Sequence, residues 1–270
     1  MRHEVLKREF EFNHNDFEFI SKLVKKNIGI VLGPHKKDMI YRRLSKRILE
    51  LNLSSFKDYC LVLEQDNAEL VNLANAISTN LTSFFREDHH FTHLEGYLLE
   101  LTQRKKDVLM WSAGCSNGCE PYSMAMVASE VQLKNRFDYK ILATDIDTNV
   151  IEKGRAGIYE AEWTEKIPAR FKKYYKDADE HYIIDPKITA RTHFRRLNLL
   201  DPWPMKKKYD VVFCRNTVIY FDKDTQAKLF DRIANQMVQD GILYIGHSEN
   251  LQKVSDRYLP IGKTTYRRIK

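Results

Sequence analysis

The sequence contains no long apolar run. Its longest apolar stretches, such as YDVVFC (209–214) and GILYIG (241–246), have the length of single strands. A membrane-spanning helix needs about 20 consecutive apolar residues, so the sequence predicts no membrane span. The N-terminal segment, MRHEVLKREFEFNHNDF, is charged and lacks the apolar centre of a secretory signal. We therefore expect the chain to stay in the cytoplasm.

Cysteines are also few. Four cysteines in 270 residues without an export signal are typical of reduced thiols and not of a disulfide framework. Cys115 and Cys119 have a C-x3-C spacing, but no second Cys or His pair follows at a usable distance. Because a zinc site needs about four ligands, the sequence predicts no metal site.

The composition is otherwise that of an ordinary globular protein. Hydrophobic residues make up 43% and charged residues 30% of the 270, enough for one large domain or two of unequal size. The formal net charge of +7 favours an acidic partner. Charge alone does not choose among nucleic acid, an acidic protein and an anionic membrane.

Two regions differ in their hydrophobic rhythm. Up to residue 78, apolar residues such as Phe17, Ile20 and Val24 recur at helical spacing, with no strand pattern between them. From Val108 onward, four apolar runs alternate with helical stretches, namely VLMWSA, KILATD, YDVVFC and GILYIG. This alternation is typical of a mostly parallel, doubly wound sheet with helices on both faces. We therefore expect an all-α domain at 1–78 and an α/β domain at 79–270.

Residues 160–196, approximately, fit the α/β rhythm poorly. The segment HYIIDPKITARTHF (181–194) alternates like a hairpin with Asp-Pro at its turn. We therefore expect an inserted subdomain with a small antiparallel β element. The connecting segment STNLTSFFREDHHF (78–91) is not rich in Gly and Ser, so we expect it to pack against its surroundings.

The loop after the first predicted strand indicates a cofactor. It reads GCSNG (114–118) and lacks one glycine of the G-x-G-x-x-G that holds a dinucleotide pyrophosphate. Glu120 follows, where a carboxylate disfavours phosphate and favours a cation. Asp145 is the first acid after the second strand, and we prefer it to Asp147 as a partner for ribose hydroxyls. A cofactor with a ribose and a positive charge but no phosphate matches S-adenosylmethionine.

Two ordinary interpretations of these acids stay open on the residues alone. Glu120 can be an acid that complements the helix dipole, and Asp145 can be a solvated strand end.

Six motifs together resemble one family. They are NLTSFFRE (80–87), WSAGCSNGCEPYSMA (111–125), ATDID (143–147), NLLD (198–201), CRNTVIYFD (214–222) and GHSEN (246–250). In this order, and with the helical N-terminal region, the chain resembles the CheR family of chemotaxis receptor methyltransferases. One departure is Cys119, where the family more often carries an acid. The resemblance implies a Rossmann-like class I methyltransferase domain. It also implies methyl transfer from S-adenosylmethionine to chemoreceptor glutamates, which leaves S-adenosylhomocysteine and serves sensory adaptation in bacterial chemotaxis.

The resemblance also implies roles for individual residues. Asn80, Thr82 and Arg86 would border the methionine part of the cofactor. Glu120 would bind its ammonium group and Asp145 its ribose, and Asn198 with Leu199 would contact the adenine edge. Arg215 and Asn216 follow the predicted strand YDVVFC, again on the cofactor side of the sheet. The full set is Asn80, Thr82, Arg86, Glu120, Asp145, Asn198, Leu199, Arg215 and Asn216.

The implied reaction needs no general base, because a glutamate with a reference pKa of about 4.3 is ionised at pH 7. Arg86 and Tyr220 are the candidates for orienting the incoming carboxylate, since an Arg fork fits a carboxylate and a phenol adds one directed hydrogen bond. On the residues alone, a surface salt bridge for Arg86 and a core-edge aromatic for Tyr220 stay open. For His89, His90 and His247 we expect packing or structural roles.

The segment KKDMIYRRLSKRILEL (36–51) predicts a basic amphipathic helix. We expect Arg42, Arg43 and Lys46 to turn away from its apolar face and Arg47 to lie at the border. A solvated charged face is the ordinary interpretation. The resemblance implies that Arg42, Arg43 and Arg47 dock onto acidic helices of the cytoplasmic receptor domain. The enzyme would then act at membrane receptor arrays without inserting into the bilayer.

The predicted β insertion is short and has no glycine at its turn, so we do not expect it to hold a carboxyl-terminal receptor peptide. Other functions fit the residues less well. A nucleic-acid methyltransferase is disfavoured, because RNTVIYF (215–221) lacks the Pro-Pro-aromatic segment that grips a flipped base. A non-catalytic module that senses S-adenosylmethionine or scaffolds receptors is disfavoured by the retained Asn80, Arg86 and Tyr220.

Overall fold

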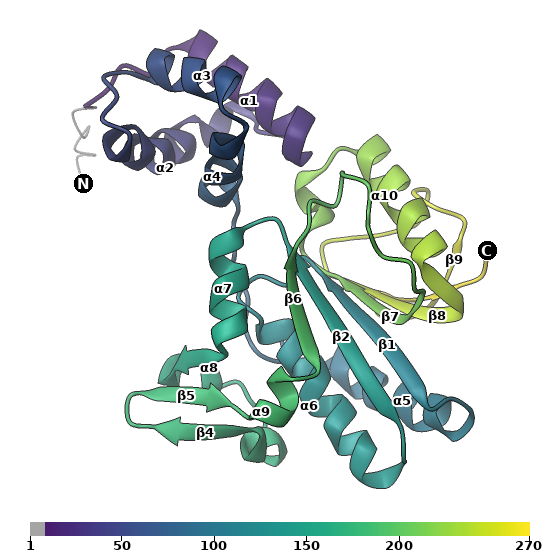
Figure 1. Ribbon diagram of the computed structural model, residues 1–270. Coiled ribbons are helices and arrows are strands. Elements are labelled where there is room, and N and C mark those ends of the chain that lie inside the picture. Colours follow the sequence, from purple (N-terminus) through teal and green to yellow (C-terminus); the bar gives the residue numbers. More distant parts are fainter. Residues whose placement is uncertain (1–8) are drawn as a thin grey trace, which may run out of the picture. The chain divides into compact units, whose positions relative to one another are not determined.

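The computed structural model describes residues 9–270, which form two compact units (Figure 1). One unit ends at Thr79, and the other runs from Asn80 to Lys270. Each unit buries apolar residues of its own. Among the described helices, none is both long enough and apolar enough to cross a bilayer.

The first unit is helical. Its described residues form α1 (His14–Ile28), η1 (Pro34–Lys36), α2 (Lys37–Glu50), α3 (Phe56–Gln65) and α4 (Asn67–Ile77). Polar side chains cap the first turns of α1, α3 and α4. At α1, Asn13 and Asp16 form a capping box. Apolar positions predicted from the helical spacing, such as Ile20 and Leu44, are fully buried. The all-α expectation for this region is therefore confirmed.

The second unit is built on a seven-stranded sheet with the order β6-β2-β1-β7-β8-β10-β9. Neighbouring strands from β6 to β8 pair in parallel, whereas β10 is antiparallel to both β8 and β9. The strands are β1 (Asp107–Ala113), β2 (Asp138–Asp145), β6 (Thr192–Arg196), β7 (Tyr209–Cys214), β8 (Met237–Ile245), β9 (Tyr258–Gly262) and β10 (Thr265–Arg268). The four predicted apolar runs are β1, β2, β7 and β8, which confirms the α/β class.

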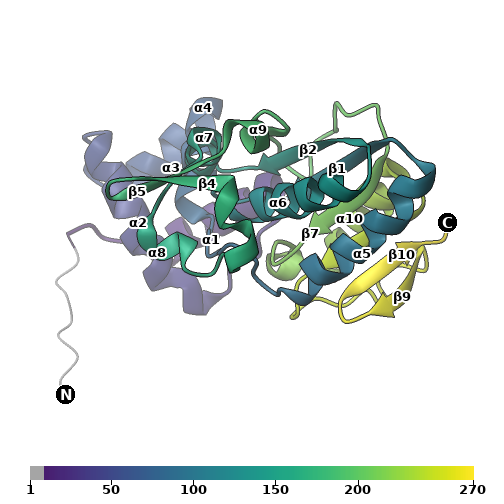
Figure 2. The same cartoon turned by 90° about the horizontal axis from the view of Figure 1, so that it is seen from below.

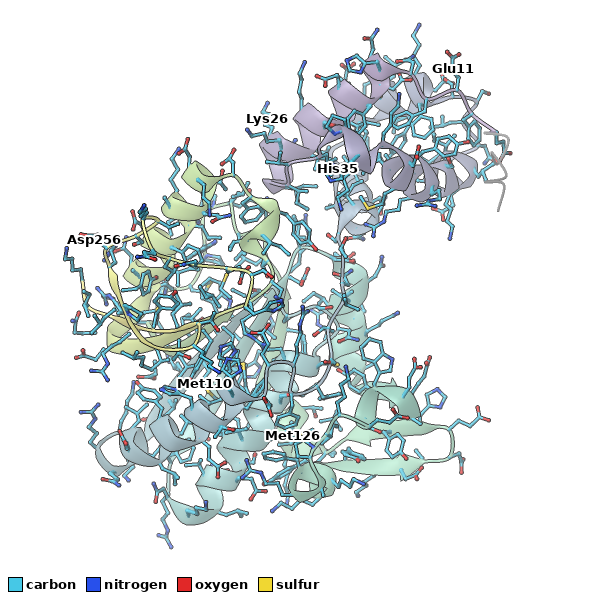
Figure 3. The ribbon with its side chains drawn as sticks, turned by 180° about the vertical axis from the view of Figure 1, so that it is seen from behind. Glu11, Lys26, His35, Met110, Met126 and Asp256 are labelled. Carbon is cyan, nitrogen blue, oxygen red and sulfur yellow. The ribbon has the colours of Figure 1, made fainter. Side chains whose placement is uncertain are left out.

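Helices cover both faces of this sheet (Figure 1). On one face α5 (His89–Arg104) and α6 (Cys119–Lys134) form a core that includes Met110. On the other face α10 (Lys223–Gln236) forms a core that includes Trp111. Successive residues of β1 therefore contribute to two cores, as the period-2 geometry of a strand requires. Figure 3 shows Met110 and Met126 in the packed interior, whereas Asp256 points outward.

A small antiparallel sheet lies between β2 and β6 in the sequence. It has the order β3-β5-β4, and Figure 2 shows β4 and β5 beside α8 and away from β7 and β10. Its strands are β3 (Ile158–Glu160), β4 (Tyr175–Ala178) and β5 (His181–Ile184), accompanied by α7 (Thr148–Ala156), α8 (Ala161–Thr164), η2 (Ala169–Tyr174) and α9 (Pro186–Thr189). The expected antiparallel element is thus present.

The predicted hairpin within it is wrong. The strands turn at residues 179–180, whereas Asp185 caps α9 and Pro186 opens it. Proline suits the first turn of a helix as well as a tight turn, because its fixed φ fits both. The last residues of the predicted insertion, 192–196, form β6 of the large sheet, parallel to β2. The apolar pattern missed β6 because it is an edge strand on which three of five residues are exposed.

Candidate functional site

The candidate site lies at the carboxyl ends of β1 and β2. Since β1 is flanked by β2 and β7, the strand order reverses here, and ligands of doubly wound sheets bind at such points. The loop after β1 turns through Gly114 and Gly118, with φ of 89° and 96°, where side chains are rarely tolerated. A Cβ on Gly114 would lie 2.1 Å from Thr217 Oγ1. Close packing against the loop after β7 accounts for Gly114 without a bound phosphate.

Glu120 is buried in the first turn of α6. Its Oε1 accepts a hydrogen bond from Ser112 Oγ at 2.7 Å, and its Oε2 accepts one from Arg215 Nη1 at 3.0 Å. Burial raises the pKa of Glu120, although Arg215 opposes this shift. A buried, paired acid is more than an exposed complement of the helix dipole. The structure therefore brings Glu120 and Arg215 together at the carboxyl end of β1.

Arg215 also connects the loop after β7 to the segment that precedes α5. Its Nη2 donates to the carbonyl of Arg86, and its side chain is only 2% exposed. The guanidinium of Arg86 donates to the carbonyl of Leu81 at 2.7 Å. Within residues 9–270 no carboxylate pairs with Arg86, so the surface salt bridge left open by the sequence is not formed.

Asp145 ends β2 and organises the turn after it. Its Oδ2 accepts from the Ser116 amide at 2.8 Å, and its Oδ1 accepts from the Asp147 amide at 3.1 Å. Burial raises the pKa of Asp145 to about 6. Each carboxylate oxygen can accept a second hydrogen bond, which leaves acceptor capacity for a ribose hydroxyl.

Asn80 is hydrogen-bonded to the loop after β1 and to the loop after β2. Its Nδ2 donates to Asp147 Oδ2 at 2.6 Å, and its carbonyl accepts from Ser116 Oγ at 3.2 Å. Asp147 also caps α7 through the Asn149 amide at 2.9 Å. These two hydrogen bonds of Asp147 thus stabilise the local structure. Thr82, two residues after Asn80, is half-buried.

Asn198 and Leu199 follow β6. Asn198 Oδ1 accepts from the Leu200 amide at 3.1 Å, which shapes the turn. The Leu199 side chain belongs to the core beside α10, so only its backbone can face a ligand. Sequence reasoning missed Arg232, which donates to the carbonyls of Leu199 and Leu200 and stacks 4.2 Å from the Trp203 ring. No local motif marks Arg232, because its partners lie about thirty residues away.

Glu249 organises the loop that carries Asn216 and Tyr220. Its carboxylate accepts from the amides of Asn216, Val218 and Gly246 at 3.0, 3.1 and 2.5 Å. Asn216 adopts a left-handed φ of 56°. The motif GHSEN contains Glu249, but sequence reasoning considered only its histidine. Tyr220 lies in η3 (Val218–Tyr220), half-buried, and its phenol bonds to no other described residue.

Two of the four cysteines lie at the loop after β1, one within it and one at the start of α6. Cys115 and Cys119 are buried free thiols. Burial raises the pKa of both, which keeps them in the thiol form.

The basic helix α2 differs from its expected exposure. Arg43 Nη1 donates to the carbonyls of residues 76, 77 and 78 at 3.2, 2.6 and 2.9 Å, which satisfies the end of α4. Arg47 forms a fork with Glu69, whose side chain is 3% exposed. The expectation that Arg43 turns away from the fold is therefore wrong, because partners distant in sequence bind it. Arg42 and Lys46 are exposed.

Comparison with known proteins matches both units. Residues 15–78 match the all-alpha domain of CheR methyltransferases, and residues 80–267 match the SAM-binding domain of CheR methyltransferases. The match to the second domain alone covers more than half of the chain.

Three relatives extend this match over nearly the whole chain. A probable chemotaxis protein methyltransferase of Rhizobium etli is 39% identical over 258 residues, 91% of this chain and 96% of the relative. Chemotaxis protein methyltransferase 2 of Pseudomonas aeruginosa is 36% identical, covering 96% and 95%. The chemotaxis protein methyltransferase of Escherichia coli is 37% identical, covering 93% and 89%. With both domains matched and this identity sustained, the chain belongs to the CheR methyltransferase family.

Proposed function

We propose that this chain transfers the methyl group of S-adenosylmethionine to glutamate side chains of chemoreceptors. The products would be glutamate methyl esters and S-adenosylhomocysteine. Besides family membership, one observation carries the proposal, namely the buried Glu120–Arg215 pair at the carboxyl end of β1. The methionine end of the cofactor bears an ammonium group and a carboxylate, and a buried acid beside a buried base complements both.

Other atoms of the site fit this cofactor. Arg215 Nε is buried without a hydrogen-bond partner, so the guanidinium has a donor available for a carboxylate. Asp145 has spare acceptor capacity at the end of β2, where ribose hydroxyls bind in doubly wound folds. The loop after β1 has no third glycine for a pyrophosphate. These features favour a nucleoside with an amino-acid arm over a dinucleotide.

When bound, S-adenosylmethionine supplies an electrophilic methyl group. The nucleophile is the receptor glutamate, already ionised at pH 7. The chain therefore has to hold the carboxylate in line and exclude water, not to remove a proton. Tyr220 has a phenol without a partner among the described residues, and Arg86 uses one donor on Leu81, leaving others for the incoming carboxylate.

For the receptor we propose docking through the exposed part of the basic helix. Arg42 and Lys46 present positive charge on α2, which suits an acidic receptor helix. Such charges raise the rate of encounter more than the affinity, and salt screens them. Arg43 and Arg47 support this surface from within the helical unit. The enzyme would act in the cytoplasm, at membrane receptor arrays.

The test is incubation with methyl-labelled S-adenosylmethionine and a membrane fraction of the source cells. A glutamate methyl ester is alkali-labile, so label on a receptor-sized band should be released by mild base. Label that resists base, or binding of the cofactor without any transfer, would contradict the proposal. The second result would instead support a non-catalytic sensor.

A further inference from the structure

Glu87 lies against the candidate cofactor site, although the family resemblance assigns it no contact. It follows Arg86 and precedes α5. Its Oε2 is 3.5 Å from Arg215 Nη2, while Arg215 Nη1 donates to Glu120 at 3.0 Å. One buried guanidinium is therefore shared by two carboxylates.

The backbone around Glu87 is held in an unusual conformation. Phe85 and Glu87 have left-handed φ values of 50° and 57°, which non-glycine residues seldom adopt. Three contacts fix the segment: the Phe85 amide donates to Ser123 Oγ at 3.0 Å, Arg215 donates to the Arg86 carbonyl, and His247 Nδ1 lies 2.9 Å from Glu87 Oε1. Strained residues held by several contacts are characteristic of functional sites.

Glu87 also belongs to a group of three side chains that offer ligand atoms for a metal ion. Donor atoms of Glu87, His89 and His90 lie within 4.8 Å of one another. Glu87 Oε2 and His90 Nδ1, 3.7 Å apart, are buried without hydrogen-bond partners. However, Arg215 already places a positive charge beside Oε2, and it would repel a divalent cation in this buried setting. The geometry therefore favours Glu87 as the countercharge of Arg215.

The two carboxylates around Arg215 differ in character. Burial raises the pKa of Glu120. Burial also acts on Glu87, but the hydrogen bond with His247 and the charge of Arg215 outweigh it and lower the pKa of Glu87. The two directions agree with the geometry in making Glu87 a countercharge of Arg215.

We propose that Glu87 is a positioning residue that neutralises Arg215 while Glu120 binds the ammonium group of the cofactor. This inference rests on the proposed function. Without the charge of Glu87, Glu120 is the remaining carboxylate among the described residues that contacts Arg215. Its oxygens are then committed to the guanidinium and bind the ammonium group poorly.

The test compares two ligands by calorimetry on the full chain and on Glu87→Gln. S-adenosylhomocysteine carries the amino-acid arm, whereas 5′-methylthioadenosine lacks it. Glu87→Gln should weaken S-adenosylhomocysteine binding by about tenfold or more, the usual effect of losing a charged partner, and leave 5′-methylthioadenosine binding unchanged. Glu87→Asp keeps the charge and should restore part of the loss. The matched control is Glu152→Gln, which removes an exposed partner of Arg155 on α7.

Each outcome decides between roles. If Glu87→Gln weakens both ligands equally, Glu87 only maintains the fold of its segment, and the positioning role is wrong. An unchanged affinity for both ligands also overturns it. If the parent protein binds 5′-methylthioadenosine but not S-adenosylhomocysteine, the proposed cofactor is wrong, and the positioning role fails with it.

Discussion

Each unit contains an Arg–Glu pair whose glutamate is buried, and the two pairs are built differently. In the helical unit, Glu69 is saturated: Arg47 Nε and Nη2 donate at 2.8 and 2.7 Å, and Tyr59 and Asn72 add hydrogen bonds of 2.9 Å each. In the α/β unit, Arg215 gives Glu120 one bond and keeps an unpartnered Nε.

The pKa directions follow this difference. Burial opposes ionisation of Glu69, but its three hydrogen-bond donors lower the pKa. With fewer donors, burial prevails and raises the pKa of Glu120. A saturated pair stabilises a fold, whereas an incompletely paired one has atoms free for a ligand. The following four predictions test the structural role of the first pair and the binding roles proposed for the rest of the molecule.

The largest effect on stability is expected from Arg47→Ala. It leaves the Glu69 carboxylate without its cation, and breaking a fully buried pair costs about 3–5 kcal/mol. Because the Arg47 side chain is 25% exposed, we expect a loss of about 2 kcal/mol in the free energy of unfolding. Urea denaturation measures it, with exposed Arg42→Ala as control. Equal stabilities of the two variants would show that the pair is not structural.

Asp145→Ala should leave the fold intact and weaken S-adenosylmethionine binding by about 1–3 kcal/mol, since ribose hydroxyls lose a charged acceptor. Calorimetry gives the dissociation constant. Asp145→Asn keeps one acceptor for the turn and serves as the milder variant. An unchanged constant in folded Asp145→Ala would remove this residue from the site.

Cofactor affinity should also depend on pH through Asp145, whose pKa burial raises to about 6. Binding by an ionised carboxylate is complete above that value. It weakens as pH falls through it, by at most about tenfold per unit for one proton. Titrations at pH 8 and pH 5 measure the effect. Asp145→Asn should lose this dependence, and a persisting slope would assign it to another group.

The smallest effect concerns receptor docking. Arg42→Ala with Lys46→Ala should reduce the initial methylation rate a few-fold at low salt and leave cofactor affinity intact. The difference should shrink as salt rises. Lys26→Ala with Lys57→Ala removes the same charge from exposed positions of α1 and α3. If both double variants methylate receptors equally well, α2 has no special docking role.

Removing Arg42, Arg43 and Arg47 together would not test docking alone. Arg43 binds the carboxyl end of α4 and Arg47 binds Glu69. Their loss would therefore lower stability and methylation together. Glu120, Asp145 and Asn216 were easier to propose as site residues, because each lies at or after the end of a strand that the sequence predicts. Arg232 and Glu249 were not predicted as organisers, since backbone amides and carbonyls of other loops bind them.

The sequence by itself determined the helical and α/β regions, the four central strands and the loops at their carboxyl ends. These features depend on local periodicity and on turn residues a few positions apart. Only the tertiary structure decided which charged groups meet. Arg47 and Glu69 are 22 residues apart, and Arg215 and Glu120 are 95 apart. The sequence shows such residues only as single charges, and folding alone brings one arginine to the buried Glu69 of the helical unit and the other to the buried Glu120 at the carboxyl end of β1.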